Sequence, residues 1–496
     1  MKKILIFISI LFVTFFSFNT RLDAKSYNYY VYGEPIEQAD SYITKKVLDN
    51  TNLLDIDGNK VSLGYLTDVI SNNGLLYVSD QTNNRILVIN QDYLVIDTYP
   101  KQEFDGDGVL LPEYALNQPN GIYIKNNKLY VCDSKNYRVV IYDLDTKEYI
   151  SEINNPNAPI FDVQADGKKL NFEPLKVTVD RTGRAFVIAK DVYEGILDFD
   201  PNGSFNRFFG TSNVKMSLIE TLIYKLSSEK QKAQMAKKLQ TSFVNLTLDQ
   251  NGNVYALSSA RNTSKVVKKL NNKGKDILIS RGYIPVMGDS QVLGTSKYNN
   301  VPAGGSELVD IVVSENENRY SAIDKTRGRI FTYDREGNLL YICGQIGSQS
   351  NMFQNPTGVT YLGDLIVACD ADKKTIVFFE PTEFGSLINQ ATDYYLNYDY
   401  ENAKKVWEEV LKLNSNYYLA YAGIGKAQLR EGNYKDALKN LEIGFDRYNY
   451  SQAYELYRSQ QLGKVLPYII VGIFALLGGL FVLNIKNSLK RDKEGA

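Results

Sequence analysis

The sequence contains no histidine, only three cysteines and a single tryptophan among its 496 residues. The absence of histidine excludes Ser-His-Asp triads, imidazole acid–base catalysis and zinc sites with histidine ligands. Three scattered cysteines are too few for a disulfide framework or a four-cysteine zinc site. The chain also lacks an excess of either charge, since 56 basic and 57 acidic residues give a net charge of −1. A nucleic-acid-binding protein would carry a strongly basic domain or stripe, so this class is disfavoured.

The three cysteines each lie in an apolar strand pattern, at Cys132, Cys343 and Cys369. We therefore expect small buried hydrophobic residues at these positions, not reactive thiols. Their spacing gives no support for a disulfide pairing.

The N-terminal residues 1–24 have the pattern of a secretory signal. Lys2 and Lys3 precede an apolar stretch from Ile4 to Phe18, and a polar segment ends at Ala24. Cleavage after Ala24 is our expectation, and an uncleaved N-terminal anchor is the alternative.

The C-terminal part of the chain predicts a membrane anchor. No charged residue occurs between Lys464 and Lys486, and a helix over residues 465–485 would span about 30 Å, the thickness of a bilayer core. Basic residues outnumber acidic ones in the tail, residues 486–496, which the positive-inside rule places in the cytoplasm. We therefore expect a single-pass cell-membrane protein with the bulk of its chain outside the cytoplasm.

A strand–turn–strand pattern recurs six times between residues 60 and 385. In the clearest copies a short apolar strand ends in aspartate, as at Asp80 and Asp133, and a second apolar strand begins at Arg85 or Arg138. Four short strands per copy cannot bury both faces of one sheet, so six such sheets predict a six-bladed β-propeller over residues 27–388. The last copy has no obvious fourth strand, and we expect residues 27–40 to supply it and close the ring.

The best copy also shows a family resemblance. It contains Pro119-Asn-Gly-Ile122, then Leu129-Tyr-Val-Cys-Asp133, then Asn136-Tyr-Arg-Val139, and this pattern resembles the NHL repeat. The resemblance implies the fold and says little about function.

The recurring Asp–Arg pairs favour a structural role over a catalytic one. An aspartate at a strand end can accept hydrogen bonds from turn amides, and the arginine that opens the next strand can pair with it. A feature present in most blades holds hairpins together, whereas a catalytic site normally uses one copy. We predict no catalytic residue, and the sequence favours a protein that is not an enzyme.

Alignment of the six copies places one residue of each just before the innermost strand, at the mouth of the central channel: Asp68, Gly121, Lys176, Asn245, Asp310 and Gly358. The long connections 100–117, 151–172 and 280–306 lie on the same face, which suggests a binding face. We expect the polar members, Asp68, Lys176, Asn245 and Asp310, to line a binding site.

No cofactor is expected, with one alternative. Asp68, Asn245 and Asp310 offer oxygen ligands that suit calcium. Gluconolactonase-like hydrolases resemble this chain at the level of the fold and carry a metal in this region, but Lys176 would add a positive charge to the ring. A metal-dependent hydrolase is therefore the alternative function.

Residues 213–241 form a distinctive insertion with helical spacing of apolar residues: Leu218, Ile219, Leu222, Ile223 and Leu226. Lysines outnumber glutamates around them. Such a basic amphipathic pair of helices either covers the propeller as a lid or contacts a partner or an anionic membrane.

From residue 389 to 462 a helical pattern recurs with a period of 34 residues, relating Tyr400, Ala403 and Trp407 to Tyr434, Ala437 and Leu441. This pattern resembles the tetratricopeptide repeat (TPR). The segment is either a spacer next to the propeller or a docking groove for a peptide.

The complete arrangement resembles a family of exported bacterial proteins whose genes often lie near components of ABC transporters for sugar uptake. The resemblance implies an accessory or scaffold role at the outer face of the membrane. Our first hypothesis is a tethered interaction protein that binds an envelope protein or a glycan through the long-loop face. A lectin-like module with tyrosines stacked on sugars is a third possibility.

Overall fold

The computed structural model describes residues 26–162, 170–210, 227, 242–259, 266–289 and 305–494. The chain divides into two compact units, residues 1–386 and 387–496. The first unit is mainly β and the second is helical, so each is described separately.

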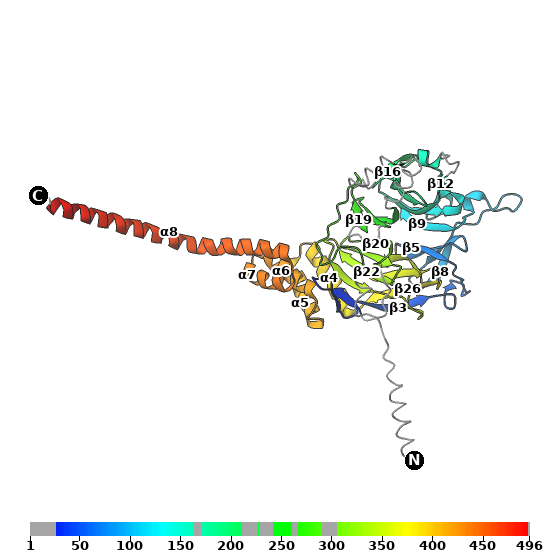
Figure 1. Cartoon of the computed structure of the whole chain (residues 1–496). Helices are drawn as coiled ribbons and strands as arrows, with labels where there is room; N and C mark the ends of the chain where they lie inside the picture. The colour runs from blue at the N-terminus through cyan, green and yellow to red at the C-terminus, as the bar shows by residue number, and fades with distance from the viewer. Residues whose placement is uncertain are drawn as a thin grey trace, which may run out of the picture. The chain divides into compact units, whose positions relative to one another are not determined.

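The β unit is a six-bladed propeller with strands that follow one another from the centre outwards (Figure 1). Blade 1 contains β5 (Leu66–Asn72), β6 (Leu75–Asp80), β7 (Arg85–Ile89) and β8 (Leu94–Tyr99), with β4 (Leu54–Asp55) outside β8. Blade 2 contains β9 (Pro119–Lys125), β10 (Lys128–Asp133), β11 (Arg138–Asp143) and β12 (Tyr149–Ile153). Blade 3 contains β13 (Pro174–Val179), β14 (Ala185–Ala189), β15 (Ile196–Phe199) and β16 (Phe205–Phe209).

Blades 4 to 6 continue the ring. Blade 4 contains β17 (Phe243–Leu248), β18 (Val254–Ser258) and β19 (Val267–Leu270). Blade 5 contains β20 (Leu308–Val313), β21 (Arg319–Asp324), β22 (Arg329–Asp334) and β23 (Leu339–Cys343). Blade 6 contains β24 (Pro356–Leu362), β25 (Leu365–Asp370), β26 (Thr375–Pro381) and β3 (Tyr42–Leu48). The sequence prediction of a mainly β, six-bladed propeller followed by helices is confirmed.

The strand that closes the ring is β3, which pairs antiparallel with β26 from Leu48 opposite Ile376 to Tyr42 opposite Pro381 (Figure 1). The expectation that residues 27–40 supply this strand is therefore wrong, although the closure does use a strand from the N-terminal region. Leu48 is 1% exposed and packs in the core between blades 6 and 1. The aromatic alternation of residues 27–32 misled the prediction, because β3 carries three consecutive polar or charged residues, Thr44, Lys45 and Lys46, in its middle and so has a weak strand pattern.

Residues 27–37 form a separate hairpin instead. Its strands β1 (Tyr27–Tyr29) and β2 (Pro35–Glu37) pair with each other, and Asn28 Nδ2 donates to the carbonyl oxygens of Leu339 (3.1 Å) and Leu340 (3.3 Å). The hairpin is thus bound to blade 5, which is the neighbour of blade 6, the blade that β3 completes.

Blade 4 departs from the expected four strands. Outside β19, among the described residues, lies a short irregular segment in which Leu270 bridges to Asp276 and Ile277 N donates to Lys269 O at 2.7 Å. The segment then leaves the blade, since Arg281 N donates to Glu336 O of blade 5. It takes the place of a fourth strand over a few residues only.

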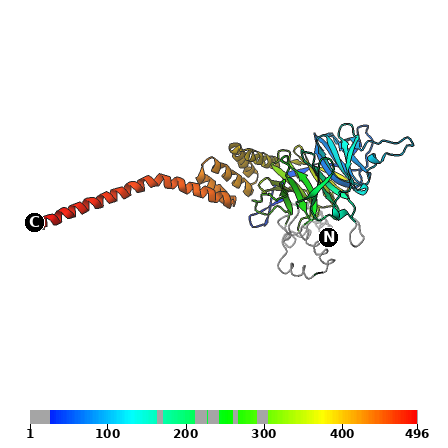
Figure 2. The ribbon, with the colours of Figure 1, turned by 90° about the horizontal axis from the view of Figure 1, so that it is seen from above.

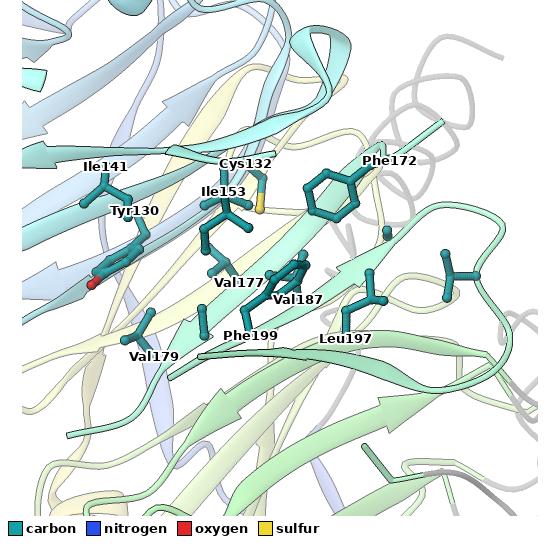
Figure 3. Packing of buried hydrophobic residues seen from close by; sticks show 14 of the residues in the cluster. Tyr130, Cys132, Ile141, Ile153, Phe172, Val177, Val179, Val187, Leu197 and Phe199 are labelled. Atoms are coloured by element: carbon teal, nitrogen blue, oxygen red, sulfur yellow. The ribbon is translucent and has the colours of Figure 1, made fainter. Parts of the chain in front are cut away.

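The hydrophobic cores lie between neighbouring blades. The layer between blades 2 and 3 contains Tyr130 and Cys132 from β10, Val177 from β13 and Phe199 from β15, and Figure 3 shows these side chains directed into one layer from both sheets. Each buried valine, leucine or phenylalanine stabilises the fold by about 1.5–3 kcal/mol. All three cysteines are buried and free, as the sequence predicted.

The helical unit contains most of α4 (Glu383–Leu396), then α5 (Tyr400–Leu413), α6 (Tyr418–Arg430), α7 (Tyr434–Ile443) and α8 (Arg447–Glu494). Asp399 caps α5 by accepting a hydrogen bond from Asn402 N at 3.2 Å. Gly423 of α6 faces Trp407 of α5 so closely that a Cβ atom would lie 2.3 Å from the indole nitrogen. The expected helices are present, and their assignment to the TPR family stays a prediction.

Helix α8 continues well beyond this bundle (Figure 2). Residues 447–487 of this helix are long and apolar enough to cross a membrane, and the most apolar window is not buried in the protein. Pro467 lies inside the helix, where its ring removes one backbone hydrogen bond. A C-terminal segment able to act as a membrane anchor is thus confirmed, whereas its orientation stays a prediction and the N-terminal signal lies outside the described residues.

Candidate functional site at the centre of the propeller

A hydrogen bond repeated in all six blades fixes the start of each innermost strand. In each blade a residue one or two positions after the second strand donates its N–H to a carbonyl just before the innermost strand, at 2.8–3.1 Å. The pairs are Gln81–Tyr65, Lys135–Asn117, Lys190–Glu173, Ser259–Ser242, Lys325–Glu307 and Ala371–Asn355. We call the surface formed by these turns and by the connections into the innermost strands the loop face. Because strands alternate in direction, the other two turns of each blade lie on the opposite face.

Each innermost strand has a β-bulge directly after this bond. The register shifts occur between Leu66 and Asp68 in blade 1, and at the same point of the other blades. A bulge re-aims the next side chain. The residues that follow the bulges are those the sequence alignment had placed at the channel mouth: Asp68, Gly121, Lys176, Asn245, Asp310 and Gly358.

Three of these residues meet at the centre. The Lys176 ammonium lies 2.7 Å from Asp68 Oδ1 and 3.8 Å from Asp310 Oδ1. The side chains are 10%, 6% and 7% exposed, respectively. Blades 1, 3 and 5 therefore supply a buried carboxylate–ammonium–carboxylate triad.

The second oxygen of each carboxylate binds backbone. Asp68 Oδ2 accepts from Ile122 N at 2.8 Å, and Asp310 Oδ2 accepts from Val359 N at 2.6 Å. Asn245, the fourth predicted polar residue, uses its Nδ2 to donate to Val309 O at 2.9 Å. Each of these side chains thus ties its own blade to the next, and Asn245 has no hydrogen bond or ion pair to the triad among the contacts of the described residues.

Glycine at the other two positions gives the neighbouring blades room. A Cβ atom on Gly121 would lie 2.6 Å from Leu175 O and 2.8 Å from the Lys176 Cδ atom. A Cβ atom on Gly358 would lie 3.1 Å from the backbone N of Val69 and 3.0 Å from Cys369 Sγ. A side chain at either position would displace the strand of the next blade.

Burial and the charges at the centre shift the pKa values of the groups there. Burial alone would lower the pKa of Lys176, but Asp68 and Asp310 outweigh burial and raise it, so the amine is charged at any physiological pH. Burial raises the pKa of Asp310 to about 7, an effect that Lys176 opposes and Asp68 reinforces. Burial also raises the pKa of Cys369 to about 12, which keeps that thiol neutral.

The predicted calcium ligands do not fit a metal ion in this arrangement. Calcium takes six to eight oxygen ligands, yet Asp68 and Asp310 each share one oxygen with the Lys176 ammonium and the other with a backbone N–H. Across the described residues no group of three or more His, Cys, Asp or Glu side chains is arranged to hold a metal. The ammonium lies where a metal would have to bind.

The Asp–Arg pairs have the structural role that their recurrence indicated. Asp133 accepts from Arg138 Nε at 2.9 Å and from Asn117 N at 2.7 Å, so it fixes both the hairpin and the connection into β9. Asp80 binds Arg85 and Gly64 N in the same way. In blade 5 the pattern changes, because Arg329 donates to Gly344 O.

Sequence reasoning missed a second buried polar cluster, around Asp289. This carboxylate is fully buried and accepts from the hydroxyls of Tyr27 (2.8 Å) and Tyr29 (2.5 Å), while Arg327 Nε lies 3.4 Å away. Burial, reinforced by Asp289, raises the pKa of both tyrosines, which keeps them protonated as donors. The alternating tyrosines were visible in the sequence, but nothing there connected them to an aspartate more than two hundred residues away.

Two other predicted elements are the connection 100–117 and the insertion 213–241. The connection 100–117 is described and contains a small hairpin with a Phe104–Leu110 bridge, in which Asp105 accepts from the N–H groups of Asp107 and Val109 as a turn residue. The amphipathic insertion 213–241, with Leu218, Ile219, Leu222, Ile223 and Leu226, lies outside the described residues apart from position 227.

One comparison with known proteins supports the propeller. Residues 43–226 match a family model described as a 6-bladed beta-propeller. No curated protein matches the chain in sequence.

Among solved structures, the chain is similar to a streptogramin B lyase, with 11% identity and a TM-score of 0.40 over 69% of this chain and 100% of that one. It is similar to hydrazine synthase of Kuenenia stuttgartiensis, with 12% identity and a TM-score of 0.37 over 66% and 97% of the two chains. A protein of unknown function from Bacteroides thetaiotaomicron shows 13% identity and a TM-score of 0.41 over 71% and 80%.

Proposed function

We propose that this chain is a membrane-tethered extracytoplasmic scaffold protein that binds an envelope protein through the loop face of its propeller. The observation that carries the proposal is the set of six hydrogen bonds that tie the end of each connection, where it enters the innermost strand, to the adjacent turn. Because these bonds hold the loop ends on rigid blades, the face is suited to present a surface to a partner.

Attachment to a membrane is supported by α8, whose most apolar window is not buried by any of the residues that the structure describes. The proposal has three finer parts. We propose that the chain is exported, that a glycan is a possible ligand, and that the protein works beside an ABC transporter for sugars. They rest on the sequence pattern of the ends and on the family resemblance.

The alternative, a gluconolactonase-like metal-dependent hydrolase at the channel mouth, has less support. Its site would need the carboxylates of Asp68 and Asp310 as ligands, and Lys176 already neutralises both. We therefore favour binding over catalysis.

A groove in the helical unit is a second candidate docking surface. It is lined by Tyr398, Asp399, Tyr400, Glu401, Lys404, Lys405, Glu408 and Glu431. Tyr398 is 75% exposed, so a ligand in this groove would contact an aromatic ring that otherwise faces water.

Site-specific photo-crosslinking in membranes of the native host tests the proposal. A photoreactive residue at Tyr137, which is exposed on the loop face, is compared with one at Glu148 in the opposite-face turn of the same blade, and with one at Tyr398. We expect a discrete protein adduct from position 137 and none from position 148. Equal labelling at 137 and 148, or an adduct from position 398 alone, would contradict binding through the loop face.

A further inference from the structure

The centre of the propeller is built as an ion site. Alternate blades supply its members, Asp68 from blade 1, Lys176 from blade 3 and Asp310 from blade 5, and all three are at least nine-tenths buried. Two carboxylates at this depth repel each other and are poorly solvated unless a cation lies between them.

The cation in this site is part of the chain. The Lys176 ammonium approaches one oxygen of each carboxylate, at 2.7 and 3.8 Å. The remaining oxygens are occupied by the N–H groups of Ile122 and Val359. The carboxylates are thus satisfied without a further ligand.

The strand that carries Lys176 lies very close to blade 2. A Cβ atom on Gly121 would lie 2.6 Å from Leu175 O and 2.8 Å from both the Cα and the Cδ atom of Lys176. Glycine at position 121 therefore allows the close approach of this strand and leaves room for the lysine stem.

We propose that Lys176 is the structural cation of the propeller centre and takes the position of a divalent metal ion, so that this propeller needs no bound metal but comes to depend on one when the ammonium is removed. With alanine at position 176, the Asp68 and Asp310 oxygens that face the ammonium are free to bind a hard divalent cation such as calcium, and water in the space left by the stem would supply its remaining ligands. The inference does not rest on the proposed scaffold function.

Thermal unfolding of the full-length chain in detergent, together with metal analysis of the purified protein, tests the inference. For the native chain we expect a Tm that changes by no more than about 1 °C between chelator and millimolar calcium chloride. For K176A we expect a Tm lower by roughly 5–15 °C in chelator, because one partner of a buried ion cluster is lost. Calcium should restore at least half of that loss and bind with a stoichiometry near one.

Two controls separate a new metal site from general effects of calcium. K176M also removes the charge, but its side chain fills the space, so its Tm should fall without recovery in calcium. K176A/D310N removes one carboxylate and should not recover either. A native chain that contains a stoichiometric metal, and loses stability when that metal is chelated, would overturn the inference.

The remaining outcomes concern the effect of calcium on the Tm and folding of K176A. Recovery no greater than that of K176M counts against the inference, and so does a K176A chain that cannot be obtained folded with or without calcium. A K176A chain obtained folded only in the presence of calcium supports it.

Discussion

Lys176 of blade 3 forms a 2.7 Å ion pair with Asp68 of blade 1, although blade 2 lies between them in the chain. The pair connects sheets that share no strand and no inter-blade core. Together with the β3–β26 pairing, it joins the ring at the centre as well as at its closure. A propeller is held mainly by contacts between adjacent blades, so a bond across the centre adds a constraint of a different kind.

The pH dependence of stability should reflect the raised pKa of Asp310. In the unfolded chain its pKa is about 3.9, and in the folded protein it is about 7, chiefly because of burial. Between these values the folded protein binds more protons than the unfolded one, so the free energy of unfolding falls as pH rises from about 4 to about 7. The fall from this residue is at most about 4 kcal/mol.

Thermal or urea unfolding of the native chain at several pH values checks this expectation, with D310N as the matched variant. D310N keeps the shape of the side chain and does not titrate, so its slope over the same window should be smaller. Asp324, whose pKa burial raises to about 6, adds to the slope in both proteins. A native chain that becomes more stable from pH 5 to pH 7, or a D310N slope equal to the native slope, would refute the assignment.

Replacement of Gly121 by alanine should destabilise the propeller by about 1–3 kcal/mol. The new methyl group would meet Leu175 O and Lys176 Cα, which belong to the strand of the next blade and cannot move alone. Gly106 is the control, because a Cβ atom there has no neighbour within 4 Å. Urea unfolding should show a lower midpoint for G121A and an unchanged one for G106A, and equal midpoints would mean that the centre is less tightly packed than described.

Two residues of the ring-closing strand β3 should differ strongly in how much they contribute to stability. Leu48 is 1% exposed in the core between blades 6 and 1, so L48A should cost about 2–5 kcal/mol. Ile43, at the other end of β3, is 46% exposed, and I43A should change stability by less than about 0.5 kcal/mol. If denaturant unfolding gave the larger effect for I43A, the assignment of β3 as the closing strand would need revision.

The N-terminal hairpin should depend on the hydroxyl groups that reach Asp289. Y29F removes one hydrogen bond to a buried carboxylate and should cost about 1.5–3 kcal/mol, while Tyr27 continues to donate. Y32F is the control, since Tyr32 is 72% exposed. Limited proteolysis near residue 30 should be faster for Y29F than for Y32F, and identical rates would show that the hairpin is held by other contacts.

Local pattern was enough to predict much of this architecture. Four aspartate-terminated strands, which end at Asp80, Asp133, Asp324 and Asp370, together with two looser copies predicted six sheets, because each sheet repeats the same short-range requirements of strand and turn. The alignment also brought the right residues to the centre, since a position that follows a bulge in one blade is equivalent in all blades. The prediction failed for the N-terminal strand, where the Tyr27–Tyr32 alternation looked more strand-like than β3, which carries Thr44, Lys45 and Lys46 in its middle.

The repeat, the burial of the cysteines and the apolar C-terminal helix could all be predicted without a structure, because they follow from the period and polarity of neighbouring residues. Three contacts became visible in the folded chain alone: Lys176 lies between Asp68 and Asp310, Gly121 lets the strand of Lys176 come close, and Tyr27 and Tyr29 converge on Asp289. These contacts join residues from different blades, and their distances depend on how the ring closes, which no local pattern encodes.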